Sequence, residues 1–365
     1  MRPRRAYLGP PGQGAAWEID FAGIRSPMKG LSKAMRGKGH GAKVAVVTGG
    51  SGGVGRAVVR DLSAHGYDVA VMARGRAGVE GAVAEVEANG RRGLALLVDV
   101  ADHRAVEAAV RQIVETWGTI DLWVNTAFVG AIAYSWDLPA KDVRRITEVT
   151  YLGQVHGTLA ALEVMRPKDD GVIINVGSAL AYRGIPLQAA YCGAKHAVKG
   201  FTESVMAELK HEHSHVRLCM VELPGLNTTQ FSWNKNTMDA DPQPVPPIYQ
   251  PEVAARVVRR IAAHPRRNSW VGIPTAYTIL GNRIAPGLLD RYLGRTGVDA
   301  QLSDQPLPRW GSNLRKPRDE TVDRGARGPF DEAAHSHELV SRLGMVRSAP
   351  GRGVAAVGRM LRRKG

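Results

Sequence analysis

The stretch KVAVVTGGSGGVG, Lys43 to Gly55, joins a short apolar run to a glycine-rich loop. Glycines at positions 49, 53 and 55 allow a tight turn and let backbone N–H groups approach a ligand closely. A glycine loop alone is a weak signal. Here it follows a strand pattern and precedes a helical one, which is typical of a turn that binds a pyrophosphate at a helix N-terminus.

Outward from this loop, short β-rich runs alternate with longer helical patterns. The strand candidates lie at 43–48, 67–73, 93–100, 120–127, 171–178 and 216–223, and the helical candidates include 79–88, 104–117, 140–165 and 189–211. Uninterrupted apolar strands are typical of a parallel sheet that is covered on both faces. The order predicts a doubly wound, Rossmann-like α/β fold with helices on both faces.

The chain divides into four segments by composition. Residues 1–42 are basic and rich in Gly and Pro, and we expect disorder there, with Met28 or Met35 as alternative translation starts. Residues 43–228 form the expected Rossmann-like nucleotide-binding domain. Residues 229–303 add a Pro-rich loop, a helix from Pro251, a strand in SWVGIP (269–274) and further helices that cover the substrate. Residues 304–365 are expected to be an extended Arg/Pro/Gly-rich tail, with a short helix near 354–363.

The net charge of +15 lies mostly in the two ends of the chain. Residues 1–42 hold eight Lys/Arg against two acids, and residues 309–365 hold thirteen against six, so the body is close to neutral. Dispersed arginines without interleaved aromatics are typical of solvated tails, and we expect no specific nucleic-acid site.

Cysteine usage and hydropathy favour a cytoplasmic protein. Cys192 and Cys219 give neither a disulfide framework nor a zinc spacing, and the N-terminus lacks the apolar core of a secretory signal. The apolar stretch 271–289 is broken by Pro274 and Pro286, which argues against a membrane span. A helix that lies on a membrane or covers a pocket remains open. The HEHSH cluster at 211–215 falls at a helix end, where the dipole favours histidines, so we expect no metal site.

The pair Tyr191 and Lys195 combines two side chains that can take part in proton transfer. Residues four apart on a helix share a face, and a nearby ammonium lowers the pKa of a phenol. A tyrosine so tuned can pass a proton to or from an alcohol oxygen. Alone, the pair is more typical of an ordinary helix surface.

Together these features resemble the short-chain dehydrogenase/reductase family. Thr48 to Gly55 has its T-G-x-x-x-G-x-G spacing, Tyr191 and Lys195 match Y-x-x-x-K, and Ser178 stands thirteen residues before Tyr191. "VDV" at 98–100 and "PG" at 224–225 also match, and residues 229–310 resemble a little-characterised bacterial subgroup with a C-terminal extension. The resemblance implies that Tyr191 is the general acid/base, that Lys195 lowers its pKa, and that Ser178 polarises the substrate oxygen.

The resemblance also implies a set of residues that bind the nicotinamide cofactor. They are Thr48, Gly49, Ser51, Gly53, Val54, Gly55, Arg74, Asp99, Val100, Asn125, Ala127, Tyr191, Lys195, Pro224 and Gly225.

Two positions depart from the family pattern. Thr150 stands where the family usually has an Asn that holds a water in a proton relay, and we expect an altered relay through its hydroxyl. Phe128 replaces the glycine of N-N-A-G, so its ring must point away from the cofactor or reshape the pocket.

The end of the second strand bears on the choice of cofactor. Family members that prefer NAD tend to have an Asp there, whereas this chain has Ala73 and Arg74, with Arg76 nearby. A guanidinium is suited to binding a 2′-phosphate, so the sequence predicts NADP(H) over NAD(H).

The resulting hypothesis is a cytoplasmic NADP(H)-dependent oxidoreductase that interconverts an alcohol and a ketone or aldehyde. Trp, Phe and Met in QFSWNKNTM (230–238) favour a hydrophobic substrate, and the family's habit of pairing two long helices favours a homodimer or homotetramer. The alternatives are a nucleotide-binding sensor or scaffold with little turnover, supported by Thr150 and Phe128, and a membrane-surface enzyme held by 271–289.

Overall fold

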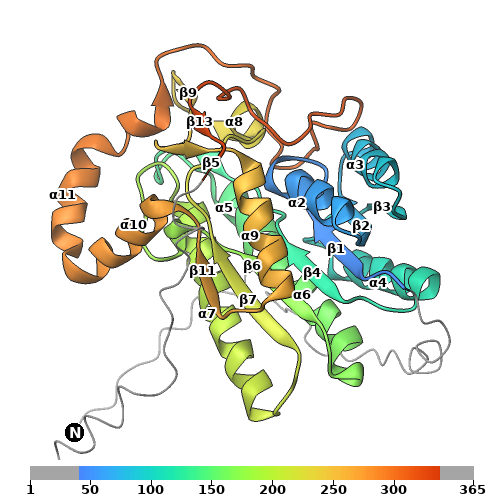
Figure 1. The fold of residues 1–365 in the computed structure, drawn as a ribbon. Coiled ribbons are helices and arrows are strands. Elements are labelled where there is room, and N and C mark those ends of the chain that lie inside the picture. The colour runs from blue at the N-terminus through green and yellow to red at the C-terminus, as the bar shows by residue number, and fades with distance from the viewer. Residues whose placement is uncertain (1–40, 338–365) are drawn as a thin grey trace, which may run out of the picture.

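A parallel seven-stranded sheet forms the centre of the computed structural model, which describes residues 41–337 (Figure 1). The strand order is β11-β7-β6-β4-β1-β2-β3, and every neighbouring pair is parallel. The strands are β1 (Val44–Thr48), β2 (Asp68–Ala73), β3 (Gly93–Leu97), β4 (Leu122–Asn125), β6 (Val172–Val176), β7 (Arg217–Glu222) and β11 (Asn268–Trp270). The order reverses beside β1, and in open sheets of this kind the ligand crevice lies at that point. The predicted fold class is confirmed.

Helices cover both faces of this sheet. One face carries α2 (Gly53–Ala64), α3 (Arg76–Ala88) and α9 (Pro251–Ala263), and the other carries α4 (His103–Trp117), α6 (Gly153–Met165) and α7 (Ala189–His211). Side chains alternate along a strand, so Val46 packs with the second group of helices and Val47 with the first. Strands that are buried on both faces account for the continuous apolar runs in the sequence.

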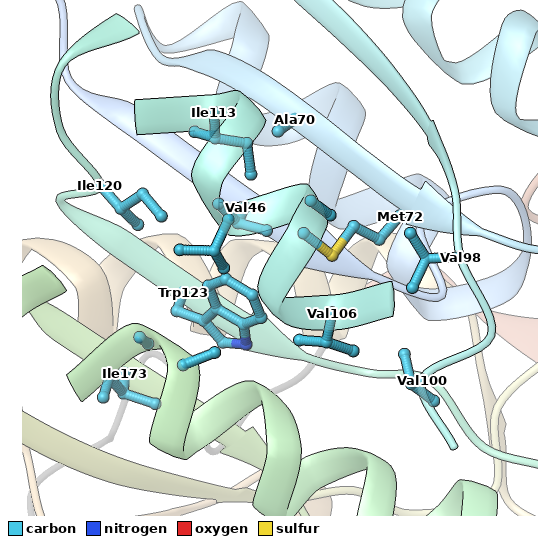
Figure 2. Packing of buried hydrophobic residues seen from close by; sticks show 14 of the residues in the cluster. Val46, Ala70, Met72, Val98, Val100, Val106, Ile113, Ile120, Trp123 and Ile173 are labelled. Atoms are coloured by element: carbon cyan, nitrogen blue, oxygen red, sulfur yellow. The ribbon is translucent and has the colours of Figure 1, made fainter. Parts of the chain in front are cut away.

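Trp123 is the largest fully buried side chain of the core (Figure 2). Its ring lies among Val46, Val106 and Ile173, and its indole N–H donates to Asn125 Oδ1 at 2.8 Å. Full burial of each large apolar side chain stabilises the fold by about 1.5–3 kcal/mol. The core thereby fixes the carboxyl end of β4 beside the glycine loop.

The segment predicted as one helix over 140–165 contains an interruption. It consists of α5 (Ala140–Thr147), a π-helical turn η2 (Glu148–Leu152) and α6. Thr150 lies in the wide turn, and its hydroxyl donates to the carbonyl of Val129 at 2.8 Å and accepts from the amide of Val129 at 3.1 Å. The π turn therefore occurs where two hydrogen bonds join this helical segment to the loop after β4.

The segment after β7 builds a rim around the carboxyl edge of the sheet. Its helical elements are α8 (Gln230–Trp233), α10 (Gly272–Ile284), α11 (Pro286–Thr296) and the short turn η5 (Asp299–Gln301). Two-residue strands tie the rim together: β5 (Ala131–Ile132) with β8 (Lys235–Asn236), β9 (Asp241–Pro242) with β12 (Leu302–Ser303), and β10 (Ile248–Tyr249) with β13 (Ala334–His335). Two further 3₁₀ turns are η3 (Arg166–Lys168) and η4 (Ala179–Ala181).

The apolar stretch 271–289 forms α10 and the start of α11, which project from one side of the molecule (Figure 1). Only the first two residues of the strand predicted at 269–274 belong to β11, because Gly272 adopts a φ of +78° and starts α10. Within residues 41–337, no helix is long and apolar enough to cross a membrane.

The C-terminal segment packs on the domain, so the expectation of an extended tail is wrong for residues 304–337. We call residues 309–331 the strap. Its backbone binds that of α8, with Trp310 N donating to Ser232 O at 2.7 Å. Leu314, Ala326 and Phe330 are buried. Single apolar residues spaced among Arg, Gly and Pro are enough to anchor a segment that has almost no regular structure. The predicted N-terminal disorder, the alternative starts Met28 and Met35, and the predicted helix near 354–363 lie outside the described residues.

Candidate active site

The loop after β1 makes a close turn against the end of β4. Gly49 has a φ of +69°, and a Cβ there would lie 2.7 Å from the Cα of Ala127. A Cβ on Gly55 would lie 2.2 Å from the carbonyl oxygen of Gly49. Larger residues at either position would push the loop away from the sheet. The two glycines thus hold the backbone of the loop next to the cavity.

The N-terminus of α2 offers donors to an anion. The N-cap residue Gly52 has no side chain to accept from the first turn, and the amides of Val54 and Gly55 find no acceptor within residues 41–337. The amide of Gly53 donates to the carbonyl of Gly325 in the strap at 3.3 Å. Free amides and the positive end of the helix dipole together fit the pyrophosphate of a dinucleotide.

A cavity of about 420 Å³ runs from this loop along the carboxyl edge of the sheet. Most of the predicted site residues line it: Gly49, Ser51, Gly53, Val54, Gly55, Arg74, Asp99, Val100, Ala127, Ser178, Tyr191, Lys195, Pro224 and Gly225. Residues from the first and the last parts of the fold meet here, because all the strands end at the same edge. Thr48, Asn125 and Thr150 do not line the cavity.

Ser178, Tyr191 and Lys195 meet at one end of this cavity. Tyr191 and Lys195 lie one turn apart on α7, with Lys195 Nζ 5.7 Å from the centre of the Tyr191 ring. Lys195 Nζ also donates to the carbonyl of Val176 at 2.7 Å. Ser178 follows β6 and caps η4, its Oγ accepting from the amide of Leu180 at 3.1 Å. The three polar side chains therefore converge where β6 ends.

Burial governs the ionisation of the pair on α7. It raises the pKa of Tyr191, while a hydrogen bond from Ser178 acts in the opposite direction. Burial lowers the pKa of Lys195 to about 8, and the carboxylate of Glu222 opposes that shift. Burial is the largest cause of the raised pKa of Tyr191, and Lys195 is not among the groups that shift it, so the predicted effect of Lys195 stays a prediction. Tyr191 is accordingly a protonated phenol at neutral pH.

Glu222 was not predicted from the sequence. It ends β7, is fully buried, and neither carboxylate oxygen has a donor in good hydrogen-bond geometry within the described chain. Burial raises its pKa to about 7, while the nearby amide of Ser178 and the ammonium of Lys195 act in the opposite direction. A Cβ on Gly177 would lie 2.2 Å from Glu222 Oε2, so the carboxyl group lies against the backbone that leads to Ser178. An acid inside the apolar run VRLCMVEL is the signal that could have found it.

Phe128 lies inside the site instead of pointing away. Its ring meets that of Tyr191 edge-on, with the ring centres 5.7 Å apart, and Lys195 Nζ lies 5.9 Å from its centre. Of the two alternatives given for Phe128, this arrangement agrees with the one in which its ring reshapes the pocket. The ring adds to the desolvation of both polar groups.

Three predicted residues have other partners. Asn125 is fully buried, donates to Asn175 Oδ1 at 2.8 Å and accepts from Trp123, so its side chain serves the core. Thr48 Oγ1 accepts from the amide of Thr126 at 3.2 Å. Thr150 is hydrogen-bonded to the backbone of Val129. Their predicted contacts with cofactor or relay water find no support in this geometry.

Arg74 lines the cavity at the end of β2 but is held by the strap. Its guanidinium donates to the carbonyl oxygens of Asn313 at 2.5 Å and Arg315 at 3.2 Å. Burial lowers its pKa, with Asp99 opposing the shift. Asp99 in turn pairs with Arg145. Hydrogen bonds to the strap thus hold Arg74, and a salt bridge joins Asp99 to Arg145.

Apolar side chains from the rim form the opposite wall of the cavity. Phe231 and Trp233 come from α8, Tyr277 from α10, and Leu289 and Tyr292 from α11. Tyr277 and Tyr292 are more than half exposed, so they stand at the mouth. The part of this wall from α10 lies near the segment after Ser178, because Asn282 Nδ2 donates to the carbonyl of Tyr182 at 2.8 Å. Trp233 instead lies against the glycine loop, where a Cβ on Gly52 would be 3.0 Å from its ring.

The histidines after α7 are not gathered around a metal. His215 Nδ1 lies 2.6 Å from Asp169 Oδ2. Between residues 41 and 337, no group of three or more His, Cys, Asp or Glu could hold an ion.

Comparisons with known proteins place the chain among similar sequences. The family model described as short chain dehydrogenase matches residues 43–240. An uncharacterised oxidoreductase, YxnA of Bacillus subtilis, is 28% identical over 310 residues, which cover 84% of this chain and 83% of that protein.

Two solved structures are also similar. A short-chain dehydrogenase from Streptomyces avermitilis aligns with a TM-score of 0.59 at 22% identity, covering 71% of this chain and 96% of its own. A metagenomic short-chain oxidoreductase in complex with NADP aligns with a TM-score of 0.53 at 25% identity, covering 63% and 95%.

Proposed function

Because this chain belongs to the short-chain dehydrogenase family, we propose that it transfers a hydride between a nicotinamide dinucleotide and a small alcohol or carbonyl compound. The observation that carries the proposal is the shared cavity. It extends from the free amides of the glycine loop to Ser178, Tyr191 and Lys195 on one side, and to Arg74 and Asp99 on the other. A nicotinamide dinucleotide has the same order, with its pyrophosphate between the reactive ring and the adenosine.

The residues around the glycine loop would hold the cofactor. The amides of Val54 and Gly55 would bind the pyrophosphate, and Asp99, Val100 and Ala127 would flank the adenosine and ribose portions. Lys195 would bind the nicotinamide ribose through its ammonium group. When bound, the dinucleotide supplies or accepts the hydride.

Tyr191 would transfer the proton. Burial keeps its phenol protonated at neutral pH, so it is ready to donate to the oxygen of a carbonyl during reduction. Ser178 would hold the same oxygen and orient it toward Tyr191. The reverse reaction needs the phenolate, which a charged Lys195 stabilises. Proton transfer by a positioned group is typically worth ~10²–10⁴ in rate.

The substrate would be hydrophobic. Aromatic and aliphatic side chains from α10 and α11 line the cavity, and a hydrogen bond from Asn282 to the carbonyl of Tyr182 ties α10 to the segment after Ser178. An apolar wall with few polar groups at one end is the usual arrangement of a site that fixes one reacting oxygen and accepts a lipophilic body.

The sequence prediction of NADP(H) over NAD(H) rests on Arg74. Its position in the cavity wall and the NADP of the similar metagenomic oxidoreductase support it. The hydrogen bonds from Arg74 to the strap oppose it, since they use donors that a 2′-phosphate would need. The choice of cofactor therefore depends on the strap.

Self-association stays a prediction. The surfaces expected to pair are those of α5, α6 and α7. Leu159 on α6 is 37% exposed, and a Cβ added to Gly193 or Gly200 on α7 would meet no atom within 4 Å. Such a surface would accept a second helix pair, and light scattering behind a sizing column would give the mass.

A sensor with little turnover is the second candidate. Phe128 against Tyr191 favours it, because a ring in the glycine position narrows the reactive end of the cavity. Retention of Ser178, Tyr191 and Lys195 in one place favours the enzyme.

Turnover of carbonyl compounds tests the proposal. Oxidation of NADH and NADPH would be followed by absorbance with aromatic, aliphatic and steroid-like ketones and aldehydes, for the wild type and for Tyr191→Phe. We expect turnover that falls at least ~10²-fold in Tyr191→Phe. Tyr134→Phe, at a tyrosine outside the cavity, is the matched control. Equal turnover in Tyr191→Phe would contradict the assigned role.

A further inference from the structure

The strap runs from α8 to the N-terminus of α3 and on to the glycine loop (Figure 1). At α3, the amide of Ala77 donates to the carbonyl of Glu320 at 3.1 Å, and the amide of Gly78 donates to the carbonyl of Asp319 at 3.0 Å. Arg56 then forms a salt bridge of 2.8 Å with Asp323. The strap is thus fixed on both sides of Asp319.

The carboxylate of Asp319 lies at the adenosine end of the cavity. A Cβ on Gly75 would be 1.9 Å from Asp319 Oδ1, and a Cβ on Gly78 would be 2.3 Å from Oδ2 and 2.9 Å from the Cβ of Ser51. The carboxylate therefore lies between the start of α3 and the glycine loop. Asp319 is only 5% exposed and lines the cavity, and its carboxylate has no hydrogen-bond donor in residues 41–337.

A carboxylate that lines a cavity and has no donor within the described chain is free to accept hydrogen bonds from a ligand. A dinucleotide whose pyrophosphate rests on the glycine loop carries its adenosine ribose toward the end of β2. That ribose brings two hydroxyl groups, in NAD(H), or one hydroxyl and a dianionic phosphate, in NADP(H). Only the first can satisfy both oxygens of a carboxylate by donation.

We propose that Asp319 binds the adenosine ribose hydroxyls from the strap and so determines that this chain selects NAD(H) over NADP(H). The inference rests on the proposed function, because it takes the cavity to be a dinucleotide site. It reverses the preference that Arg74 predicts. Family members that prefer NAD tend to have an Asp at the end of β2, where this chain has Ala73 and Arg74. Asp319 of the strap would supply a carboxylate at that end of the cavity instead.

The nearby cations do not offset this preference, because they hold the strap. Both terminal nitrogens of Arg74 donate to strap carbonyls, and Arg318 Nε donates to the carbonyl of Ser312 at 2.8 Å. A 2′-phosphate would have to compete with these contacts while lying beside the carboxylate of Asp319. Like charges that meet in a partly desolvated place repel strongly.

Binding of cofactor fragments tests the inference without any turnover. Isothermal titration of the full chain would give the Kd of ADP-ribose and of 2′-phospho-ADP-ribose, which differ only in the phosphate. We expect the wild type to bind ADP-ribose at least tenfold more tightly. Asp319→Asn should reduce or invert this ratio, because it removes the repulsion and one pair of acceptor sites.

Asp323→Asn is the matched control. It changes a second strap carboxylate that pairs with Arg56 and should weaken both ligands equally. Asp319→Ser serves as the second variant, and thermal unfolding checks that each variant folds. If both variants unfold, a wild type that binds 2′-phospho-ADP-ribose at least as tightly as ADP-ribose still overturns the inference.

The possible outcomes separate the two proposals. Tighter binding of 2′-phospho-ADP-ribose by the wild type, lost in Arg74→Ala, would overturn the inference and leave the dinucleotide site intact. An unchanged ratio in a folded Asp319→Asn would also overturn it. Failure of both fragments to bind would contradict the proposed function itself.

Discussion

Glu222 and Lys195 are two buried ionisable residues that both lie against the backbone leading to Ser178, Lys195 at the carbonyl of Val176 and Glu222 at Gly177. The pKa of the carboxyl group is raised to about 7 and that of the amine is lowered to about 8, in both cases mainly by burial. Burial thus brings the pKa values of both groups toward neutral pH. A site that moves protons during turnover benefits from such groups.

Replacement of Glu222 tests how much its buried carboxyl group lowers the free energy of unfolding. Because its folded pKa lies above the ordinary value of 4.5, its contribution to stability is greatest below pH 4.5 and is lost as pH rises through 7. Glu222→Gln removes this loss, so we expect the variant to gain stability relative to the wild type between pH 5 and pH 8, by roughly 1–3 kcal/mol. Urea unfolding at both pH values measures the change.

Glu212→Gln, at an exposed glutamate, is the control and should show no such pH-dependent gain. A Glu222→Gln variant whose stability follows that of the wild type across this range would show that the carboxyl group is not desolvated.

Spacing in the sequence was sufficient to single out Ser178, Tyr191 and Lys195, which the structure brings to one cavity, because each follows a strand end or shares a helix face. Their catalytic roles stay a prediction. It was not sufficient for Asn125, whose amide serves the core through contacts from α6 and β6. The carboxylate of Asp319 reaches the cavity through the strap, and no local pattern in the sequence indicates this contact. Glu222 does not line the cavity, and its only local signal is an acid at the end of an apolar run. Tertiary packing alone brings Asp319 to the site.

At the scale of elements, the π turn η2 holds the loop after β4 through hydrogen bonds. Thr150 in this turn makes both of its hydrogen bonds to Val129, which lies next to Phe128 in the cavity wall. A shift of η2 would therefore move Phe128 and the contacts of Tyr191. The predicted proton relay has no support from the position of this hydroxyl.

Thr150→Val should act through stability. It leaves the backbone groups of Val129 unpaired in a buried place, which costs about 1–3 kcal/mol. We expect lower stability in urea and an unchanged pH profile of turnover. A pH profile that shifts while stability stays the same would restore the relay role.

The helices α10 and α11 were the least predictable elements. Their apolar residues suggested either a membrane surface or a pocket cover, and Gly272 ended the expected strand early. Several apolar side chains remain exposed, including Ile284 at 82% and Leu288 at 65%, while Tyr277 and Tyr292 line the cavity mouth. The contacts favour the cover, which sequence periodicity could not distinguish.

Tyr292→Ala tests this role. It removes part of the apolar wall, so KM for a large hydrophobic substrate should rise about tenfold, whereas KM for a small aldehyde should hardly change. Steady-state kinetics with the two substrates measure the difference. Leu288→Ala, at an exposed residue of the same helix that does not line the cavity, is the control. Equal effects on both substrates would contradict the assignment.

At the scale of the whole molecule, the strap packs a late segment of the described chain against its first elements. It touches α8, the start of α3 and the glycine loop, so the cavity is built from both halves of the sequence. Apolar runs and glycine spacing predicted the sheet and its order, because these depend on local patterns. The packing of the strap depends on scattered single residues, and composition alone indicated a solvated tail.

Leu314→Ala should loosen the strap. Leu314 is 2% exposed, and truncation of a buried leucine typically costs about 2–5 kcal/mol. We expect weaker binding of ADP-ribose together with lower stability, measured by titration and urea unfolding. Val322→Ala, at a half-exposed strap residue, should change neither. Unchanged affinity in a destabilised Leu314→Ala variant would separate the strap from the cofactor site.

Direct transfer of a hydride is the central claim. The most direct test uses a nicotinamide dinucleotide deuterated at the reactive carbon, a hydrophobic carbonyl substrate and mass spectrometry of the alcohol formed. We predict deuterium on the former carbonyl carbon in the wild type and almost none in Tyr191→Phe. Dinucleotide binding without any label transfer to a broad panel of carbonyl compounds would contradict the claim and favour a sensor.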